Sequence, residues 1–112
     1  MTLVTANQVR KRGIEEVVTS ALRRLEETCD AIYATFDIDV LDQSAVPGVP
    51  AIGPAGLASP DLFCAAQKIG QSRKVIAMDM VCVDPTRDLR DISSRVALHV
   101  FLHFATGYAQ RK

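Results

Sequence analysis

Two aspartates at the end of a short apolar segment could bind a metal ion, in the run TFDIDVLD at residues 35–42. At positions i and i+2 of a strand, Asp37 and Asp39 would lie on one side, about 6.5–7 Å apart. Two like charges placed there repel each other unless a cation holds both ionised. Oxygen donors favour Mg²⁺, Ca²⁺ or Mn²⁺, and added imidazole favours Mn²⁺. The pair therefore indicates a divalent metal site. The alternative is that Asp39 caps a turn and that Asp37 forms an ion pair with a basic side chain from a helix.

The segments around the aspartates predict how they are positioned. Residues 31–38 and 74–83 are apolar and rich in β-formers, which predicts two strands buried on both faces. Between them, residues 59–70 predict a helix capped by Ser59 and ended by Gly70. A strand, a helix and a strand in this order form a βαβ unit with parallel strands. The aspartates then lie at the carboxyl end of the first strand, where such sheets bind ligands.

The remaining segments complete an α/β prediction. Apolar residues recur with helical period over 14–28 and again over about 92–109, so both stretches are expected to be helices. Residues 41–58 are rich in proline and glycine and predict a shaped loop of the kind that is usually functional. Two strands of this buried type do not form a stable sheet alone. Further strands are therefore expected from elsewhere.

Composition excludes several classes of function. The chain has 112 residues, with 13 Lys and Arg against 13 Asp and Glu, so neither a nucleic acid nor an anionic membrane is expected as a partner. No apolar run is long enough to cross a membrane, and the first residues do not read as a signal peptide. Three cysteines without a paired spacing predict reduced thiols and a cytoplasmic location.

The residues around the two aspartates resemble a known family. The run DIDVLD at 37–42, AVPG at 45–48 and GL at 56–57 is similar to the last metal-binding signature of the ureohydrolases, which comprise arginases, agmatinases and formimidoylglutamases. The similarity continues through MDMV at 78–81, DP at 84–85, Asp88 and SRVA at 94–97. It spans nearly the whole chain.

This resemblance implies a three-layer αβα fold with a parallel sheet, of which residues 1–112 would form the incomplete C-terminal part of one arginase-like domain. It implies two Mn²⁺ ions that share a bridging hydroxide, which attacks the amidine-type carbon of the substrate. Asp37 is then expected to bridge both metals, and Asp39 to bind one of them.

Three further residues are candidates for binding substrate or supporting the site: Asp79, Cys82 and Asp42. Because a carboxylate within an apolar strand must be paired or functional, Asp79 either supports the site or forms a buried ion pair. Cys82 either lines the substrate pocket or is simply buried. The histidines His99 and His103 have metal-compatible helical spacing, but Val100 stands where a zinc protease has its glutamate, so a helix flank or a subunit contact is expected.

The sequence departs from the family pattern in two respects. It lacks the Gly-Gly-Asp-His and Asp-Ala-His-x-Asp segments that supply the other metal ligands. In addition, Cys82 stands where members that act on guanidinium groups usually carry a glutamate. A thiol cannot form the paired hydrogen bonds that a carboxylate makes with guanidinium. The overall pattern is most similar to formimidoylglutamases.

The main hypothesis is the C-terminal portion of a manganese-dependent hydrolase that cleaves C–N bonds of amidine-type substrates, with formimidoylglutamate preferred over agmatine and arginine. The second hypothesis is an inactive paralogue that acts as an assembly module through residues 92–109. The expected partners are a small-molecule substrate, the remainder of the ureohydrolase fold or another subunit, and further copies of the chain in a homo-oligomer. The 112 residues alone are expected to bind metal weakly and to lack activity.

Overall fold

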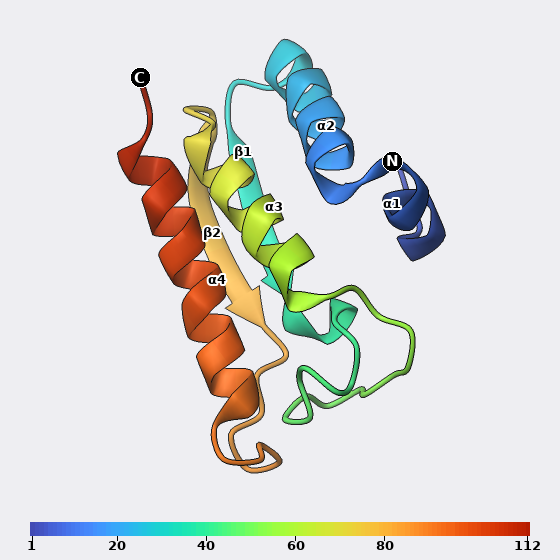
Figure 1. Ribbon diagram of the computed structural model, residues 1–112. Helices are drawn as coiled ribbons and strands as arrows, with labels where there is room; N and C mark the ends of the chain where they lie inside the picture. Colours follow the sequence, from blue (N-terminus) through green and yellow to red (C-terminus); the bar gives the residue numbers. More distant parts are fainter.

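Two parallel strands and the helix that joins them form the centre of the molecule. The computed structural model describes residues 1–112. Along the chain, helix α3 follows the first strand and helix α4 follows the second (Figure 1). The elements are α1 (Ala6–Arg12), α2 (Ile14–Thr28), β1 (Ile32–Asp37), the 3₁₀ turn η1 (Ile38–Val40), α3 (Ser59–Gln71), β2 (Val75–Val81) and α4 (Ile92–Ala109).

The pairing of β1 with β2 is parallel, as the βαβ order predicts. Thr35 lies opposite Asp79, and Asp37 lies opposite Val81, so both strands end at the same edge of the sheet. Residues that follow either strand are therefore brought together at this edge, even though the long loop and α3 separate them in sequence. The α/β class and the parallel arrangement are confirmed.

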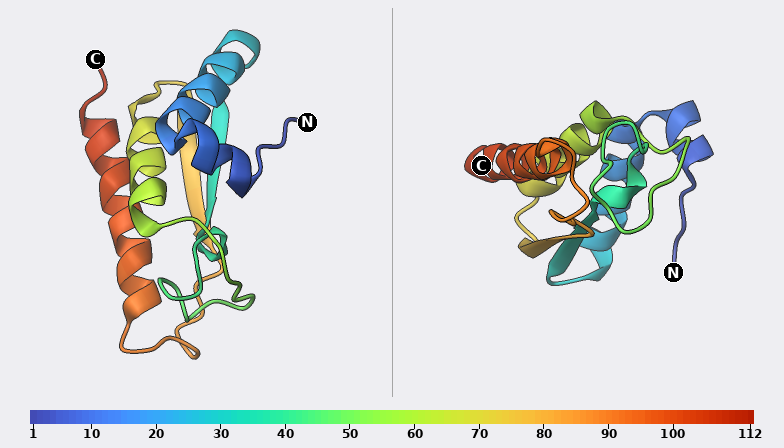
Figure 2. Two further views of the ribbon diagram at one scale, coloured as in Figure 1. Left: turned by 45° about the vertical axis from the view of Figure 1, so that its right-hand side comes forward. Right: turned by 90° about the horizontal axis from the view of Figure 1, so that it is seen from below.

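Helices α3 and α4 cover one face of this sheet (Figures 1 and 2). The ring of Phe36 on β1 meets that of Phe104 on α4 edge to face, with centroids 6.1 Å apart. The two helices pack closely because each has a glycine at the contact. A Cβ on Gly70 would lie 2.2 Å from the carbonyl oxygen of Phe104, and one on Gly107 would lie 2.0 Å from that of Gln67.

The opposite face of the sheet is open, which corrects one expectation. Tyr33 is 60% exposed and Ile76 is 72% exposed, so the strands are not buried on both faces. The reason is physical: all the helices of this chain lie on one side of the sheet (Figure 2), and no second helical layer is present among residues 1–112. None of the helices has both the length and the apolar character that crossing a membrane requires.

Helix boundaries follow the periodic pattern except at two places. Helix α1 was not expected, yet Thr5 and Gln8 form a reciprocal capping box at its start. This Thr-x-x-Gln spacing is a recognised helix-start pattern, so the signal is present in the sequence. In α3, the N-cap is Ala58 rather than Ser59, which lies inside the first turn and makes no side-chain cap, and Gly70 does not end the helix, which continues to Gln71.

Candidate metal centre

Asp37 and Asp39 lie close together because the chain turns sharply where β1 ends. Asp37 is the last residue of the strand, and Asp39 lies in the 3₁₀ turn η1, so the prediction that both lie on one strand is wrong for Asp39. The backbone N–H of Asp39 donates a hydrogen bond of 3.2 Å to Oδ1 of Asp37. The turn brings the two carboxylates closer than the spacing of an extended strand would.

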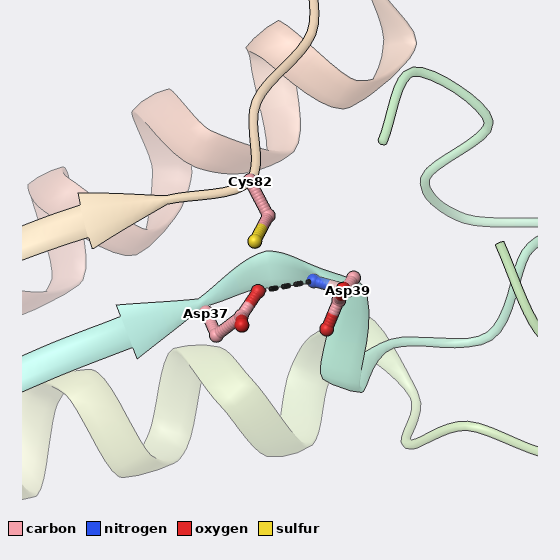
Figure 3. A group of neighbouring side chains, drawn as sticks. All are labelled: Asp37, Asp39 and Cys82. Carbon is pink, nitrogen blue, oxygen red and sulfur yellow. Dashed lines mark hydrogen bonds between the residues drawn. The ribbon is translucent and has the colours of Figure 1, made fainter. Parts of the chain in front are cut away.

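Cys82 reaches the same place from the neighbouring strand. It follows β2 directly, and its φ of 66° lies in the left-handed region that few non-glycine residues adopt. Figure 3 shows its sulfur directed toward the carboxylate of Asp37. One ligand atom from each of Asp37, Asp39 and Cys82 lies within 4.8 Å of the others. The parallel register therefore assembles a three-residue cluster that contains both predicted metal ligands.

The electrostatics of this cluster favour a cation. Burial raises the pKa of the Asp39 carboxyl, and the charge of Asp37 raises it further. An interaction with Asp37 likewise raises the pKa of the Cys82 thiol to about 11, with partial burial adding to the effect. Neither aspartate forms an ion pair with a basic side chain. Because negative charge is concentrated without a counter-ion, two carboxylates and a sulfur fit a divalent metal ion.

Asp42 has a different environment, because it organises the loop that borders the cluster. Its Oδ1 accepts hydrogen bonds from the N–H and hydroxyl of Ser44, and its Oδ2 accepts one from the N–H of Ala55. The bonds from Ser44 and Ala55 lower the pKa of Asp42, although partial burial opposes the shift. A Cβ on Gly56 would lie 2.3 Å from the amide nitrogen of Asp42, so the loop closes tightly on this residue.

Asp79 also lies outside the cluster, on the open face of the sheet. It lies opposite Thr35 on the neighbouring strand, two residues before the Asp37–Val81 pair. It forms no ion pair. The hydroxyls of Thr35 and Tyr33 lower the pKa of Asp79, against a smaller effect of burial. Its Oδ1 is buried and accepts no hydrogen bond. The structure thus shows no buried ion pair at Asp79 and leaves one carboxylate oxygen without a partner.

The long loop is attached to the start of α4. Ser93, which is fully buried, accepts a hydrogen bond of 2.7 Å from the backbone N–H of Gly48, and the carbonyl of Gly48 accepts one from Asp84. A Cβ on Gly48 would lie 2.6 Å from Cα of Asp88. No local pattern singles out Ser93, because its partner is 45 residues away.

The two histidines of α4 do not approach the cluster. The His103 ring stacks on Phe63 of α3 at a centroid distance of 4.9 Å and an angle of 4°, and the His99 ring lies 5.7 Å from the same Phe63. His103 therefore packs against α3 and His99 lies exposed beside it, in agreement with the expectation that they lie on a helix flank.

Comparison with known proteins identifies the family of this chain. The arginase family model matches residues 1–107. The chain belongs to the arginase family. Among curated relatives, formimidoylglutamase of Bacillus subtilis is 42% identical over 103 residues, which cover 92% of this chain and 32% of that protein. Agmatinase of Chromobacterium violaceum is 28% identical over 100 residues, which cover 89% of this chain and 30% of that protein.

Solved structures show the same arginase-like fold. The crystal structure of Bacillus subtilis formimidoylglutamase superimposes with a TM-score of 0.96 and 39% identity, over 99% of this chain and 35% of that one. The structure of Trypanosoma cruzi formiminoglutamase with Mn²⁺ has a TM-score of 0.81 and 31% identity, over 95% of this chain and 34% of that one. The chain thus spans about a third of the length of the relatives it matches.

Proposed function

We propose that this chain carries part of the active site of a manganese-dependent hydrolase that cleaves a C–N bond in formimidoylglutamate. The observation that carries the proposal is the convergence of Asp37, Asp39 and Cys82 at the carboxyl ends of two parallel strands, in a chain of the arginase family. The crystal structure of the Trypanosoma cruzi relative contains Mn²⁺, which supports this choice of metal.

In this proposal Asp37 and Asp39 would hold the manganese, with Asp37 as a ligand common to both ions and Asp39 as a ligand of one. When bound, the metal supplies Lewis acidity and an activated water at neutral pH. The turn at Ile38–Val40 fixes the two carboxylates relative to each other through the bond from the Asp39 N–H to Asp37. Asp42 shapes the border of the site by holding the ends of the loop together. In the same proposal Asp79 supports the site from the adjoining strand.

The donor chemistry at position 82 supports an amidine-type substrate. Agmatine and arginine carry a planar guanidinium group, which a carboxylate binds through two parallel charge-assisted hydrogen bonds. The thiol of Cys82 provides neither the charge nor the second acceptor. Position 82 therefore offers no carboxylate partner for a guanidinium group, and formimidoylglutamase of Bacillus subtilis is more similar to this chain than agmatinase of Chromobacterium violaceum is.

The uncovered surfaces of the sheet support the view that this chain functions as part of a larger folded domain. Each strand has a neighbour on one side only, and a groove of about 340 Å³ lies between α2 and β1, lined almost entirely by apolar side chains. We infer that the chain acts as the C-terminal part of an arginase-type domain, whose remainder or another subunit covers these surfaces. Because two carboxylates are too few for a stable dinuclear centre, the chain alone should bind Mn²⁺ weakly and lack activity.

Two observations favour other functions. Similarity to agmatinase keeps a guanidine hydrolase as the nearest alternative. Helix α4 also presents an exposed apolar strip, in which Leu98, Phe101 and Leu102 are 54%, 50% and 47% exposed. That strip supports a homo-oligomer, and it would be the main functional surface of an inactive assembly module. The proposed setting is cytoplasmic, which the three free cysteines support. The proposed substrate is a small molecule, and the balanced charge of the chain favours neither nucleic acid nor an anionic membrane as a partner.

The deciding experiment measures product release by the intact gene product loaded with Mn²⁺. Formimidoylglutamate, agmatine and arginine are supplied separately, and formamide and urea are quantified. We expect formamide from formimidoylglutamate, reduced more than about 100-fold by Asp37→Asn and unchanged by Asp30→Asn, an exposed control near the start of β1. Urea from agmatine alone would reject the substrate assignment, and no product from any substrate would favour the assembly module.

A further inference from the structure

Cys82 is the one member of the cluster without an assigned role in the chemistry. We propose that its sulfur is a ligand of the metal ion held by Asp37 and Asp39, so that the centre has mixed carboxylate and thiolate donors. This inference rests on the proposed metal function of the two aspartates. It assigns to Cys82 a direct metal contact, in place of the substrate contact or plain burial considered from the sequence.

The geometry supports a shared ion. Metal–sulfur and metal–oxygen bonds of about 2.3 Å and 2.2 Å keep two donors on one ion no more than about 4.5 Å apart. The ligand atoms of Asp37, Asp39 and Cys82 already lie within 4.8 Å of one another. Three donors bound to one ion lie about 3–4 Å from one another, so side-chain rotations that move the ligand atoms by up to about 1 Å are enough to place all three around one ion.

The backbone at Cys82 points to the same role. A residue that continued β2 would alternate between the faces of the sheet, whereas the left-handed φ of 66° turns Cys82 out of that alternation. The side chain is directed across the strand ends toward Asp37 (Figure 3). Non-glycine residues in this region cost energy, which the surrounding structure must offset.

Ligation is a simple exchange of a proton for a metal ion. The S–H bond breaks, the proton passes to the solvent, and the sulfur electron pair forms the bond to the metal, so no oxidant or reductant is needed. The competing role is a neutral thiol that donates a hydrogen bond to Asp37. A serine hydroxyl could replace such a donor, but it could not replace a thiolate ligand. Cys82→Ser therefore separates the two roles.

A thiolate also changes which metal the centre prefers. Soft sulfur donors strengthen binding of Co²⁺ and Zn²⁺ more than binding of Mn²⁺, and they contribute little to Ca²⁺ or Mg²⁺. We expect Cys82→Ser to weaken Zn²⁺ binding by about 10-fold or more and to weaken Mn²⁺ binding less. The ratio of Zn²⁺ to Mn²⁺ affinity, measured by competition, should fall in the variant.

Absorption spectroscopy of the 112-residue chain titrated with Co²⁺ tests the inference without any enzyme assay. Visible d–d bands report Co²⁺ bound by any donors, whereas a near-ultraviolet charge-transfer band appears only when a thiolate binds it. The expected result is a charge-transfer band that Cys82→Ser removes. Cys64→Ser and Cys29→Ser are matched controls, because these free cysteines lie outside the cluster and should leave the band intact.

The possible failures are distinguishable. Visible bands that disappear in Asp37→Asn, without a charge-transfer band in the parent chain, would leave the metal centre standing and overturn ligation by Cys82. A charge-transfer band that persists in Cys82→Ser would overturn it as well. If neither kind of band appears even at millimolar Co²⁺, both this inference and metal binding by the aspartates in this chain are overturned.

Discussion

The buried hydroxyl of Ser93 accepts a 2.7 Å hydrogen bond from the backbone N–H of Gly48, which joins the loop after Asp37 and Asp39 to the first turn of α4. Gly48 is itself buried against Asp88, where a Cβ would not fit. The border of the candidate site is therefore held by a residue from the last helix. Any change at this contact should affect both the loop and the helix.

Replacing Ser93 by alanine should destabilise the fold. The variant leaves the N–H of Gly48 buried without an acceptor, a loss that costs about 1–3 kcal/mol. Urea unfolding followed by far-ultraviolet circular dichroism measures the change in the free energy of unfolding. Ser20→Ala, on the exposed side of α2, is the matched control and should shift it by less than about 0.5 kcal/mol. Equal effects of the two variants would show that the contact contributes nothing.

The glycine contact between α3 and α4 makes a second prediction. Alanine normally stabilises a helix relative to glycine by about 1 kcal/mol. At Gly70 and Gly107, however, the new methyl group would lie 2.2 Å and 2.0 Å from backbone oxygens of the other helix. We expect Gly70→Ala and Gly107→Ala each to lower the free energy of unfolding by about 1–3 kcal/mol, because the helices must move apart. Gly53→Ala has open space around it and should be nearly neutral.

Asp88 should make the stability of α4 depend on pH. Its partial burial would raise the pKa of its carboxyl, but hydrogen bonds from the N–H groups of Ser93 and Ser94 and the Ser94 hydroxyl outweigh burial and hold the pKa well below its usual range. A carboxyl whose pKa is lowered by folding stabilises the folded state above its unfolded pKa of about 3.9. That stabilisation is lost as pH falls through the lower folded value.

Asp88→Asn tests this dependence. The urea midpoint of the parent chain should exceed that of the variant at pH 7 and pH 5, and the difference should shrink progressively below pH about 3.9. Asp91→Asn is the matched control, because Asp91 occupies the N-cap position of α4 without a side-chain cap hydrogen bond. A difference between parent and Asp88→Asn that grew toward low pH would contradict the assignment.

Manganese should stabilise the folded chain through Asp37. A ligand that binds only the folded state raises its stability in proportion to RT ln(1 + [L]/Kd), so even weak binding is detectable at high concentration. We expect millimolar Mn²⁺ to raise the melting temperature of the parent chain and of Asp30→Asn, and to leave that of Asp37→Asn unchanged. A rise of the same size in Asp37→Asn would place the ion elsewhere.

Local sequence predicts much of this fold but only part of its site. The periodic apolar stripe of residues 14–28 and the apolar run before Asp37 are strong local signals, and both elements form there. The short α1 has too few apolar positions for periodicity, so only its capping box indicates it. Strand alternation extends readily in sequence and predicts Asp39 on the strand, whereas a 3₁₀ turn after Asp37 has no comparable pattern.

The approach of Cys82 to Asp37 could not be predicted from local pattern. It depends on the register of two strands that lie far apart in sequence, and on one left-handed residue that no nearby glycine indicates. The same limitation applies to Ser93, whose role is set by a loop residue 45 positions earlier. The spacing of Asp37 and Asp39 in the sequence therefore predicts the two carboxylates, whereas the approach of Cys82 to them depends on tertiary packing.

The open face of the sheet links two binding equilibria. Tyr33, Thr35 and Asp37 are exposed and alternate with buried or half-buried residues along β1, so the carboxylate proposed to bind metal belongs to the same uncovered surface as the tyrosine and the threonine. A polypeptide that covers this surface must approach Asp37, and a metal at Asp37 removes the charge that would oppose that approach. Metal binding and coverage of the sheet should therefore be cooperative, and by thermodynamic reciprocity each should strengthen the other by the same factor.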